Sequence, residues 1–220
     1  MNTELARFNM IEQQIRPWQV LDPVVLSLLS TVKREDFVPP RHRALAFVDT
    51  PVPLGDGPGG PAMLEPKVEA RLLQELRLTH GDRVLEIGTG SGFMAALMAH
   101  RAQEVTTVER DATLAARARE NLQRAGLSRV TVIEGDAARE LPPGGPWDVI
   151  LLSGSVAEVP KSLLQALKPG GRLLAIVGQA PIMCARLFTR VSDSSWSRVD
   201  LFDTVAPRLA GFDEPSRFHF

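Results

Sequence analysis

The chain has 220 residues, of which 44% are hydrophobic and 23% are charged. Such fractions are typical of a folded globular domain, and they exclude a disordered chain, a collagen and a long coiled coil. A formal net charge of -1 gives no overall field that would attract nucleic acid. No stretch is apolar for long enough to span a membrane, and the first residues lack the apolar core of a secretory signal. We therefore expect a cytoplasmic protein with no nucleic acid, membrane or metal as a partner.

Two helices and a long loop are expected in the N-terminal part of the chain. Amphipathic patterns cover residues 4–15 and 23–33, and the second pattern begins at Asp22-Pro23, a cap followed by a proline at the first helical position. Residues 38–66 are rich in proline and glycine, which break helical and strand patterns alike. We interpret them as an ordered loop without regular structure that acts as a lid or substrate loop, since long loops in compact domains usually have a function.

From Lys67 onward, helical and strand patterns alternate at the spacing of βαβ units. Helices are expected at 67–76, from Gly92 to His100 and from Asp111 to Gly126. Short runs rich in Val, Ile and Leu are typical of buried parallel strands, and they lie at 83–87, 104–108, 130–133, 147–152 and 172–177. Residues 184–191 and 197–205 have the pattern of a terminal antiparallel hairpin.

These patterns predict an α/β fold with a doubly wound, mostly parallel sheet of seven strands, similar to a Rossmann fold, and a helical N-terminal extension. We expect one compact unit, in which residues 1–66 form the helices and the lid loop and residues 67–220 form the cofactor-binding domain. In open α/β sheets the ligand binds outside the carboxyl ends of the strands. The residues that follow each strand are therefore the candidates for a site.

The first predicted strand ends in a glycine-rich turn with the sequence EIGTGSG. Glycines allow positive φ angles and let a ligand approach the backbone N–H groups at the start of a helix. Dinucleotide sites use the spacing GxGxxG, whereas this turn has GxGxG. Glu86 would repel a pyrophosphate but would attract the cationic methionine part of S-adenosylmethionine (SAM), so the charge favours SAM. The expected cofactor-binding residues here are Glu86, Gly88, Thr89, Gly90 and Gly92.

The next two predicted strands also end in acids. Glu109, followed by Arg110, stands where a carboxylate can accept hydrogen bonds from both hydroxyls of an adenosine ribose. Asp136 and Ala137 follow the third strand, where a carboxylate and a backbone N–H can bind adenine. Each acid alone is more often a helix cap or a solvated turn residue. Together, the three strand ends predict a SAM site.

These residues resemble the class I methyltransferases and, more narrowly, the protein-L-isoaspartate O-methyltransferase family. The narrower resemblance rests on MIEQQI at 10–15, VKREDFVP at 32–39 and FVDTPVPLG at 47–55, followed by the strand-end motifs in family order. It implies methyl transfer from SAM to the carboxylate of isoaspartyl residues in damaged proteins, with S-adenosyl-L-homocysteine (SAH) as product. It also implies cofactor contacts from Met63 and Leu64, in the loop that closes over SAM.

One departure from the family concerns the methyl acceptor. Family members have a threonine-isoleucine-serine-x-proline loop that offers hydroxyls to the substrate carboxylate, whereas Ala62 and Leu64 occupy those two positions here. Ser153, Ser155 or backbone N–H groups at 62–64 are the remaining candidate donors, although SGS is also a usual strand-to-helix turn. Two alternatives stay open: the same chemistry on a different protein or small-molecule acceptor, and a SAM-binding regulator without turnover. The sequence identifies neither a catalytic residue nor the oligomeric state.

Overall fold

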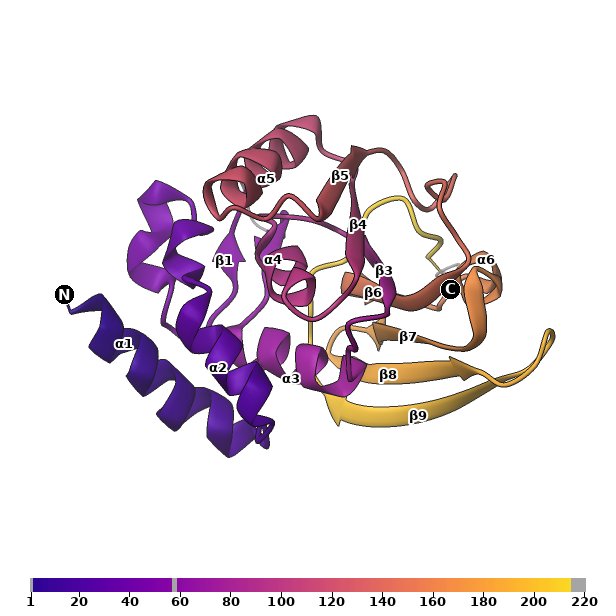
Figure 1. The fold of residues 1–220 in the computed structure, drawn as a ribbon, viewed down its shortest axis with the longest axis horizontal. Coiled ribbons are helices and arrows are strands. Elements are labelled where there is room, and N and C mark those ends of the chain that lie inside the picture. The colour runs from indigo at the N-terminus through magenta and orange to yellow at the C-terminus, as the bar shows by residue number, and fades with distance from the viewer. Residues whose placement is uncertain (1, 57–58, 215–220) are drawn as a thin grey trace, which may run out of the picture.

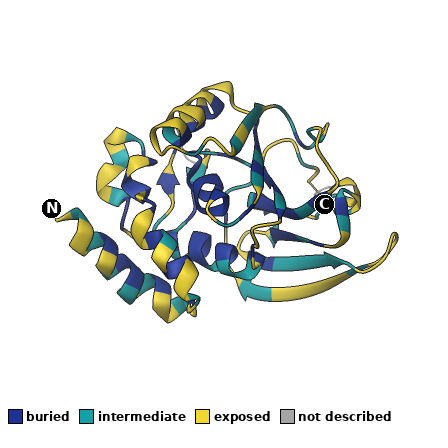
Figure 2. Cartoon of the chain, in the orientation of Figure 1, coloured by how far each residue is buried: buried dark blue, intermediate teal, exposed yellow. Residues whose placement is uncertain are grey.

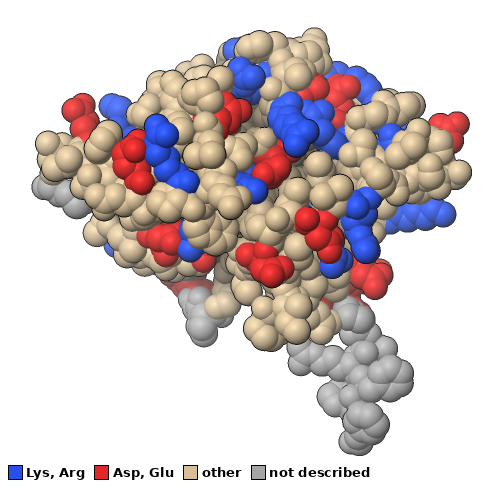
Figure 3. Space-filling model, turned by 90° about the horizontal axis from the view of Figure 1, so that it is seen from below, with Lys and Arg blue, Asp and Glu red and all other residues tan. Residues whose placement is uncertain are grey.

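A computed structural model describes residues 2–56 and 59–214 (Figure 1). The N-terminal helices α1 (Thr3–Met10) and α2 (Pro23–Thr31) lie together at one end of the molecule, and the central sheet and its terminal hairpin occupy the other end. Among the described residues, none of the helices is both long and apolar enough to cross a bilayer. Figure 3 shows that Lys and Arg side chains are interspersed with Asp and Glu on the face seen there.

The central sheet has seven strands in the order β5-β4-β3-β6-β7-β8-β9. The pairs among the first five are parallel, and β8 pairs antiparallel with both of its neighbours. The strands are β3 (Arg83–Ile87), β4 (Glu104–Glu109), β5 (Val130–Glu134), β6 (Trp147–Val156), β7 (Leu167–Gln179), β8 (Ile182–Arg190) and β9 (Trp196–Asp203). The predicted fold class and the terminal hairpin are confirmed. The order of the strands reverses at β3, which places the expected ligand crevice at the ends of β3 and its neighbours.

The two faces of the sheet pack against different layers. Val84 and alternate residues of the other central strands contact α3 (Pro66–Leu76), α4 (Phe93–Ala99), α5 (Ala112–Arg124) and the N-terminal helices. Leu85 and Ile87 point to the opposite face, where the short α6 (Lys161–Gln165) and chain segments cover the sheet. Figure 2 shows the buried residues concentrated on the central strands and on the helices that pack against them. Because both faces are covered at the centre of the sheet, β3, β6 and β7 each contain a buried, mostly apolar run.

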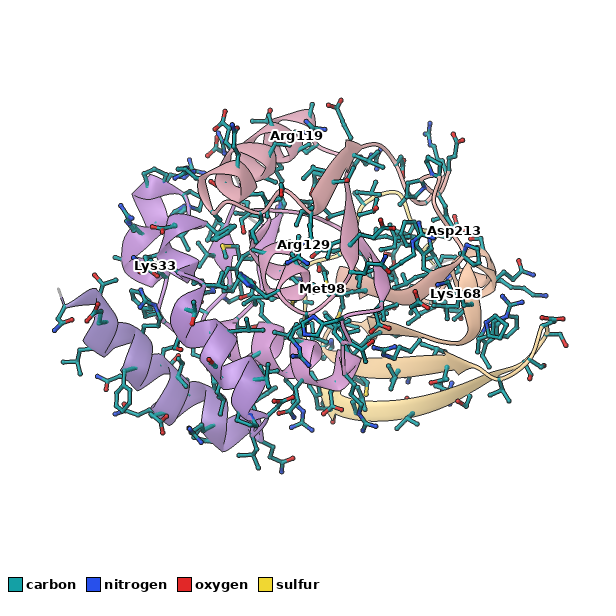
Figure 4. All side chains as sticks on the ribbon, viewed as in Figure 1. Lys33, Met98, Arg119, Arg129, Lys168 and Asp213 are labelled. Atoms are coloured by element: carbon teal, nitrogen blue, oxygen red, sulfur yellow. The ribbon has the colours of Figure 1, made fainter. Side chains whose placement is uncertain are left out.

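The helix predicted from Asp111 to Gly126 is bounded by the residues that the sequence indicates. The carboxylate of Asp111 accepts hydrogen bonds from the backbone N–H groups of Thr113 and Leu114 at 2.8 and 2.9 Å, so it caps α5. Gly126 follows that helix with a φ of 72°, a backbone conformation that favours glycine. Met98 of α4 lies in the middle of the molecule in Figure 4, and every residue of this helix is buried.

The prediction for residues 38–66 is wrong in part, because this segment contains regular structure. A 3₁₀ helix covers Pro40–Leu45, and β1 (Val52–Pro53) pairs antiparallel with β2 (Ala62–Met63). Strands of two residues are too short to produce an alternating pattern, and the proline of β1 is tolerated because this sheet has only two strands. The first helix also differs from the prediction, since α1 continues as a π-helix over Ile11–Ile15. The short α6 has no counterpart in the prediction.

Candidate active site

A cavity of about 490 Å³ lies at the carboxyl ends of β3, β4 and β5. Its wall is formed by the glycine-rich turn, the strand ends, the segment before α3 and the C-terminal segment, defined here as residues 207–212. The predicted site residues that line it are Glu86, Gly88, Thr89, Gly90, Glu109, Arg110, Asp136, Ala137, Met63, Leu64 and Ser153. Residues predicted from three strands and from the N-terminal part therefore meet in one place.

Gly92 is the exception among the predicted cofactor residues, because it lies outside the wall of this cavity. It precedes α4 with a φ of 84°, and a Cβ there would lie 3.3 Å from the side chain of Leu122 on α5. Glycine at this position thus permits the close packing of α4 against α5. This packing is a tertiary role that the motif alone does not specify, and a cofactor contact of Gly92 stays a prediction.

The glycine-rich turn requires glycine where it faces the cavity. Gly88 and Gly90 have φ angles of 91° and 53°, a region that favours glycine. A Cβ on Gly88 would approach Leu209 of the C-terminal segment to 2.7 Å, and one on Gly90 would approach Leu54 to 3.0 Å. The turn therefore lies directly beneath two segments that are distant in the sequence.

Glu86 is the most buried acid of the site, with an exposed fraction of 0%. The Ser153 hydroxyl donates to its Oε1 at 2.6 Å, and the Thr107 hydroxyl donates to its Oε2 at 2.7 Å. Burial raises the pKa of Glu86 to about 7, although these two hydrogen bonds act in the opposite direction. Glu86 is therefore poised to ionise near neutral pH when a cation binds beside it.

Glu109 lies at the end of β4, and backbone N–H groups hold its carboxylate from two sides. Gly90 N donates to Oε2 at 2.8 Å, and Asp111 N donates to Oε1 at 3.0 Å. A carboxylate has about four acceptor positions, so two remain for hydroxyl groups of a ligand. The ribose assignment made from the sequence is consistent with this geometry.

Asp136 lies at the far end of the cavity, beyond β5. Its carboxylate accepts from Ala138 N at 3.2 Å, and the side chains of Arg110 and Arg139 lie 3.7 and 3.5 Å from it. A Cβ on Gly211 would lie 2.8 Å from Asp136 Oδ1, so the C-terminal segment covers this end. Asp213, labelled in Figure 4, marks the chain just beyond this segment.

Sequence reasoning missed several residues of the cavity wall. They are Glu69 on α3, Phe93 and Met94 on α4, and Pro207, Arg208, Leu209, Ala210 and Phe212 of the C-terminal segment. Apart from Phe93 and Met94, which directly follow the glycine-rich turn, they belong to no motif, so no sequence signal marks them. Ser155, a candidate donor, lies outside the cavity wall: its hydroxyl donates to Ala206 O at 2.9 Å and anchors the C-terminal segment.

Within residues 2–56 and 59–214, no three His, Cys, Asp or Glu side chains are grouped as they would be around a metal ion. The chemistry that the cavity offers is recognition of a ligand with positive charge, hydroxyl groups and an apolar body by carboxylates, backbone N–H groups and apolar side chains.

Comparison with known proteins identifies the family. The sequence profile described as protein-L-isoaspartate(D-aspartate) O-methyltransferase matches residues 6–204. The chain belongs to this family. A relative from Rhodopseudomonas palustris strain HaA2, named protein-L-isoaspartate O-methyltransferase 1, is 43% identical over 78% of this chain and 69% of its own length. A Koribacter versatilis protein-L-isoaspartate O-methyltransferase is 37% identical over 94% of this chain and 91% of its own length.

Solved structures agree with this assignment. A protein-L-isoaspartate O-methyltransferase superposes with a TM-score of 0.78 at 25% identity over 95% of this chain, which spans 66% of the length of that protein. A Plasmodium falciparum protein, solved in complex with S-adenosyl-L-homocysteine, superposes with a TM-score of 0.76 at 20% identity over 95% of this chain and 98% of its own length, and shows the shared fold. The resemblance to this methyltransferase family that the sequence indicates is therefore confirmed.

Proposed function

We propose that this protein transfers the methyl group of SAM to the free α-carboxylate of isoaspartyl residues in proteins or peptides. The observation that carries the proposal is that one cavity is lined both by the three strand ends and by Met63 and Leu64. These two residues lie in the segment that resembles the substrate loop of the protein-L-isoaspartate(D-aspartate) O-methyltransferase family, to which the chain belongs.

The cofactor residues are assigned by charge and geometry. Glu86 pairs with the ammonium of the methionine part, because it is the buried carboxyl at the end of the central strand β3. Glu109 accepts from the ribose hydroxyls. Backbone N–H groups occupy one acceptor position on each of its oxygens, and the two remaining positions are free for the hydroxyls. Asp136 and Ala137 contact adenine, and Arg110 covers that end. Gly88, Thr89 and Gly90 let the cofactor lie against the backbone.

The reaction is an in-line displacement that needs positioning more than proton transfer. A carboxylate oxygen attacks the methyl carbon, the C–S bond breaks, and its electron pair stays on sulfur. The sulfonium becomes a neutral thioether and the carboxylate becomes a neutral methyl ester, so atoms and charge balance. A carboxylate with an ordinary pKa of about 4 is already ionised at neutral pH, and no general base is required. What the protein must supply is orientation of the carboxylate and exclusion of water.

Donors for the substrate carboxylate are the point at which this chain departs from its family. Leu64 is buried and lines the cavity with an apolar side chain. Its backbone carbonyl accepts a hydrogen bond from Arg34. Ser153, which the sequence suggested as a donor to the substrate, already donates its hydroxyl proton to Glu86. Backbone N–H groups of the 62–64 segment remain as candidate donors. This loss of hydroxyls is the observation that favours a second candidate function, methylation of a different protein site or of a small molecule.

The test is methylation of an isoaspartyl peptide and of the matching aspartyl peptide by wild type and by Leu64→Ser, with saturating SAM. The proposal predicts turnover of the isoaspartyl peptide alone, and faster turnover by Leu64→Ser. A missing hydrogen bond to a charged group costs about 1.5–3 kcal/mol, or roughly one to two decades of rate. Fast wild-type turnover that serine does not improve shows that backbone donors suffice. Absence of isoaspartyl turnover in both proteins, with SAM bound, assigns the cavity to another acceptor.

We also propose that residues 1–66 provide the substrate-facing wall and that residues 67–220 hold the cofactor. This division is supported by Leu54 and residues 59–64, which line the cavity opposite the strand ends. A peptide is the expected partner, and the interspersed charges of Figure 3 offer no single-sign surface on that face for nucleic acid. The cytoplasmic location remains a prediction from the sequence.

A further inference from the structure

A second cavity adjoins the cofactor cavity. This α5 groove, the space between residues 35–43 and α5, has a volume of about 540 Å³ (Figure 1). The two cavities share four wall residues, which are Leu54, Gly90, Ser91 and Leu114. Asn121 Nδ2 donates to Ser91 O at 2.9 Å and so ties α5 to this common rim. The α5 groove is therefore continuous with the cavity in which methyl transfer is proposed.

Four arginines and three acids line the α5 groove. They are Arg41, Arg43, Arg117 and Arg124, with Glu35, Asp36 and Glu120. Arg43 pairs with Asp36 at 3.2 Å. Arg41 pairs at 2.6 Å with Asp56, an acid outside the wall whose side chain is 91% exposed. Exposed pairs of this kind contribute little to stability, so a carboxylate of a ligand can replace either acid.

Arg117 and Arg124 lie on the α5 side of the groove. They are about two helical turns apart and share one face of the helix. Arg117 Nη1 donates to Leu54 O at 3.5 Å, and Arg124 donates to the Asn121 side chain. Within the described ranges, neither arginine forms an ion pair with a carboxylate. Glu120 is a single acid beside two cations, so this side of the groove carries an excess of positive charge.

The opposite side of the α5 groove contains a buried acceptor. Glu35 belongs to the wall, is 7% exposed and pairs through Oε1 with Arg7. Its Oε2 is buried and accepts no hydrogen bond from any described residue. Leaving a buried acceptor without a donor costs free energy, so a ligand that supplies an N–H group at Glu35 is stabilised there. The buried residues Phe37 and Val38 give this side an apolar surface.

These groups together suit an extended acidic peptide. Such a peptide supplies backbone N–H groups for Glu35 and side-chain carboxylates for Arg117 and Arg124. The phosphates of a nucleic acid offer no N–H donor and are repelled by Glu35. We propose that the α5 groove binds an acidic segment of the methyl-accepting polypeptide, beyond the residue that enters the cofactor cavity. The inference rests on the proposed function and adds to it a preference for substrates with acidic flanks.

The first test is the kinetics of methylation of paired isoaspartyl peptides at low salt with saturating SAM. One peptide carries four glutamates beside the isoaspartyl residue, its partner carries four glutamines, and each pair is made with the tract on either side. Arg117→Gln/Arg124→Gln is expected to raise the KM of one glutamate peptide, relative to that of its glutamine partner, about three- to tenfold, with no such effect on kcat. An equal rise for both peptides, or no rise, overturns the proposal.

Arg119→Gln is the matched control for this experiment. Arg119, labelled in Figure 4, belongs to the same helix, but it lies outside the groove wall and donates to Val132 O at 3.1 Å. Its substitution removes one positive charge from α5 and should leave the ratio of the two KM values as in wild type. A rise caused by Arg119→Gln as large as that of the double variant shows a general charge effect and contradicts a specific groove.

The second test does not depend on methyl transfer. Fluorescence anisotropy measures binding of a labelled glutamate peptide without isoaspartate, its glutamine counterpart and an oligothymidylate, with saturating SAH to fill the cofactor cavity. Wild type should bind the glutamate peptide most tightly, and added salt or Arg117→Gln/Arg124→Gln should remove the preference. Tighter binding of the oligothymidylate, or equal binding of the two peptides, overturns the proposal. Acidic-peptide binding without turnover of any isoaspartyl peptide rejects the isoaspartyl acceptor and supports the groove.

Discussion

The raised pKa of Glu86 couples SAM binding to proton release. Burial raises it from the ordinary value of 4.5 to about 7, so the empty site is only partly ionised at neutral pH. A bound ammonium requires the carboxylate form. Between about pH 7.5 and pH 6, the ionised fraction of a group with a pKa of about 7 falls roughly eightfold, and SAM affinity should fall by the same factor. Glu86→Gln should abolish this pH dependence and weaken SAM binding by about 1.5–3 kcal/mol at neutral pH.

The raised pKa of Glu86 also makes the stability of the folded protein depend on pH. A higher pH favours SAM binding but lowers the free energy of unfolding. The folded state binds this proton more tightly than the unfolded chain, so the contribution of Glu86 favours folding below pH 4.5 and is lost as the pH rises through about 7. One pKa unit corresponds to about 1.4 kcal/mol, and the rise from 4.5 to about 7 therefore amounts to about 3 kcal/mol. Above pH 7, Glu86→Gln should be more stable than wild type by up to this amount, since glutamine can hydrogen-bond Ser153 and Thr107 without a buried charge.

Calorimetry with SAM across the pH range and urea denaturation without ligand are the two assays. The matched control is Glu134→Gln, an exposed acid at the end of β5 that lies outside the cavity wall and should change neither quantity. SAM binding by wild type with the same pH dependence as Glu86→Gln refutes the proposed pairing with the ammonium. A Glu86→Gln protein that is less stable than wild type at pH 8 refutes the assigned cost of burial.

Three further predictions concern the cofactor. Glu109→Ala should weaken SAM binding by about 1.5–3 kcal/mol and change stability little, as measured by calorimetry and urea denaturation, and an unchanged affinity removes Glu109 from the ribose site. Gly88→Ala should lower the free energy of unfolding by about 1–2 kcal/mol or more because of the positive φ at this position, and it should also weaken SAM binding. Leu209→Ala in the same background should restore part of the lost stability, because it removes the atom that the new Cβ would approach to 2.7 Å. NAD should bind far more weakly than SAM in the same calorimeter, and tighter NAD binding contradicts the charge argument for Glu86.

The sequence predicts the strands and their ends because both depend on local pattern. Buried parallel strands are continuous apolar runs, and the acids that follow them, Glu109 and Asp136, lie at one edge because parallel strands end there together. Glycine conformations at Gly88 and Gly90 follow from the same turn. These features need no knowledge of which distant segments pack nearby.

The rest of the site depends on tertiary packing that no local pattern specifies. The C-terminal segment reaches the cavity because Ser155 N donates to Pro207 O at 2.8 Å and Leu209 N donates to Ser155 O at 2.9 Å. Glu69 has the spacing of an ordinary helical acid, and only its pairing with buried Arg34 distinguishes it. Gly92 shows that a motif position can also serve helix packing, because a Cβ there would lie 3.3 Å from the side chain of Leu122 on α5.

One measurement tests the central claim most directly. A stoichiometric amount of enzyme is mixed with methyl-labelled SAM and an isoaspartyl peptide, quenched, and analysed by mass spectrometry for the peptide methyl ester and for SAH. The account predicts equal amounts of both products, with the label on the free α-carboxylate of the isoaspartyl residue. Binding of SAM with the label retained on sulfur, or transfer of the label to the matching aspartyl peptide at an equal rate, contradicts it.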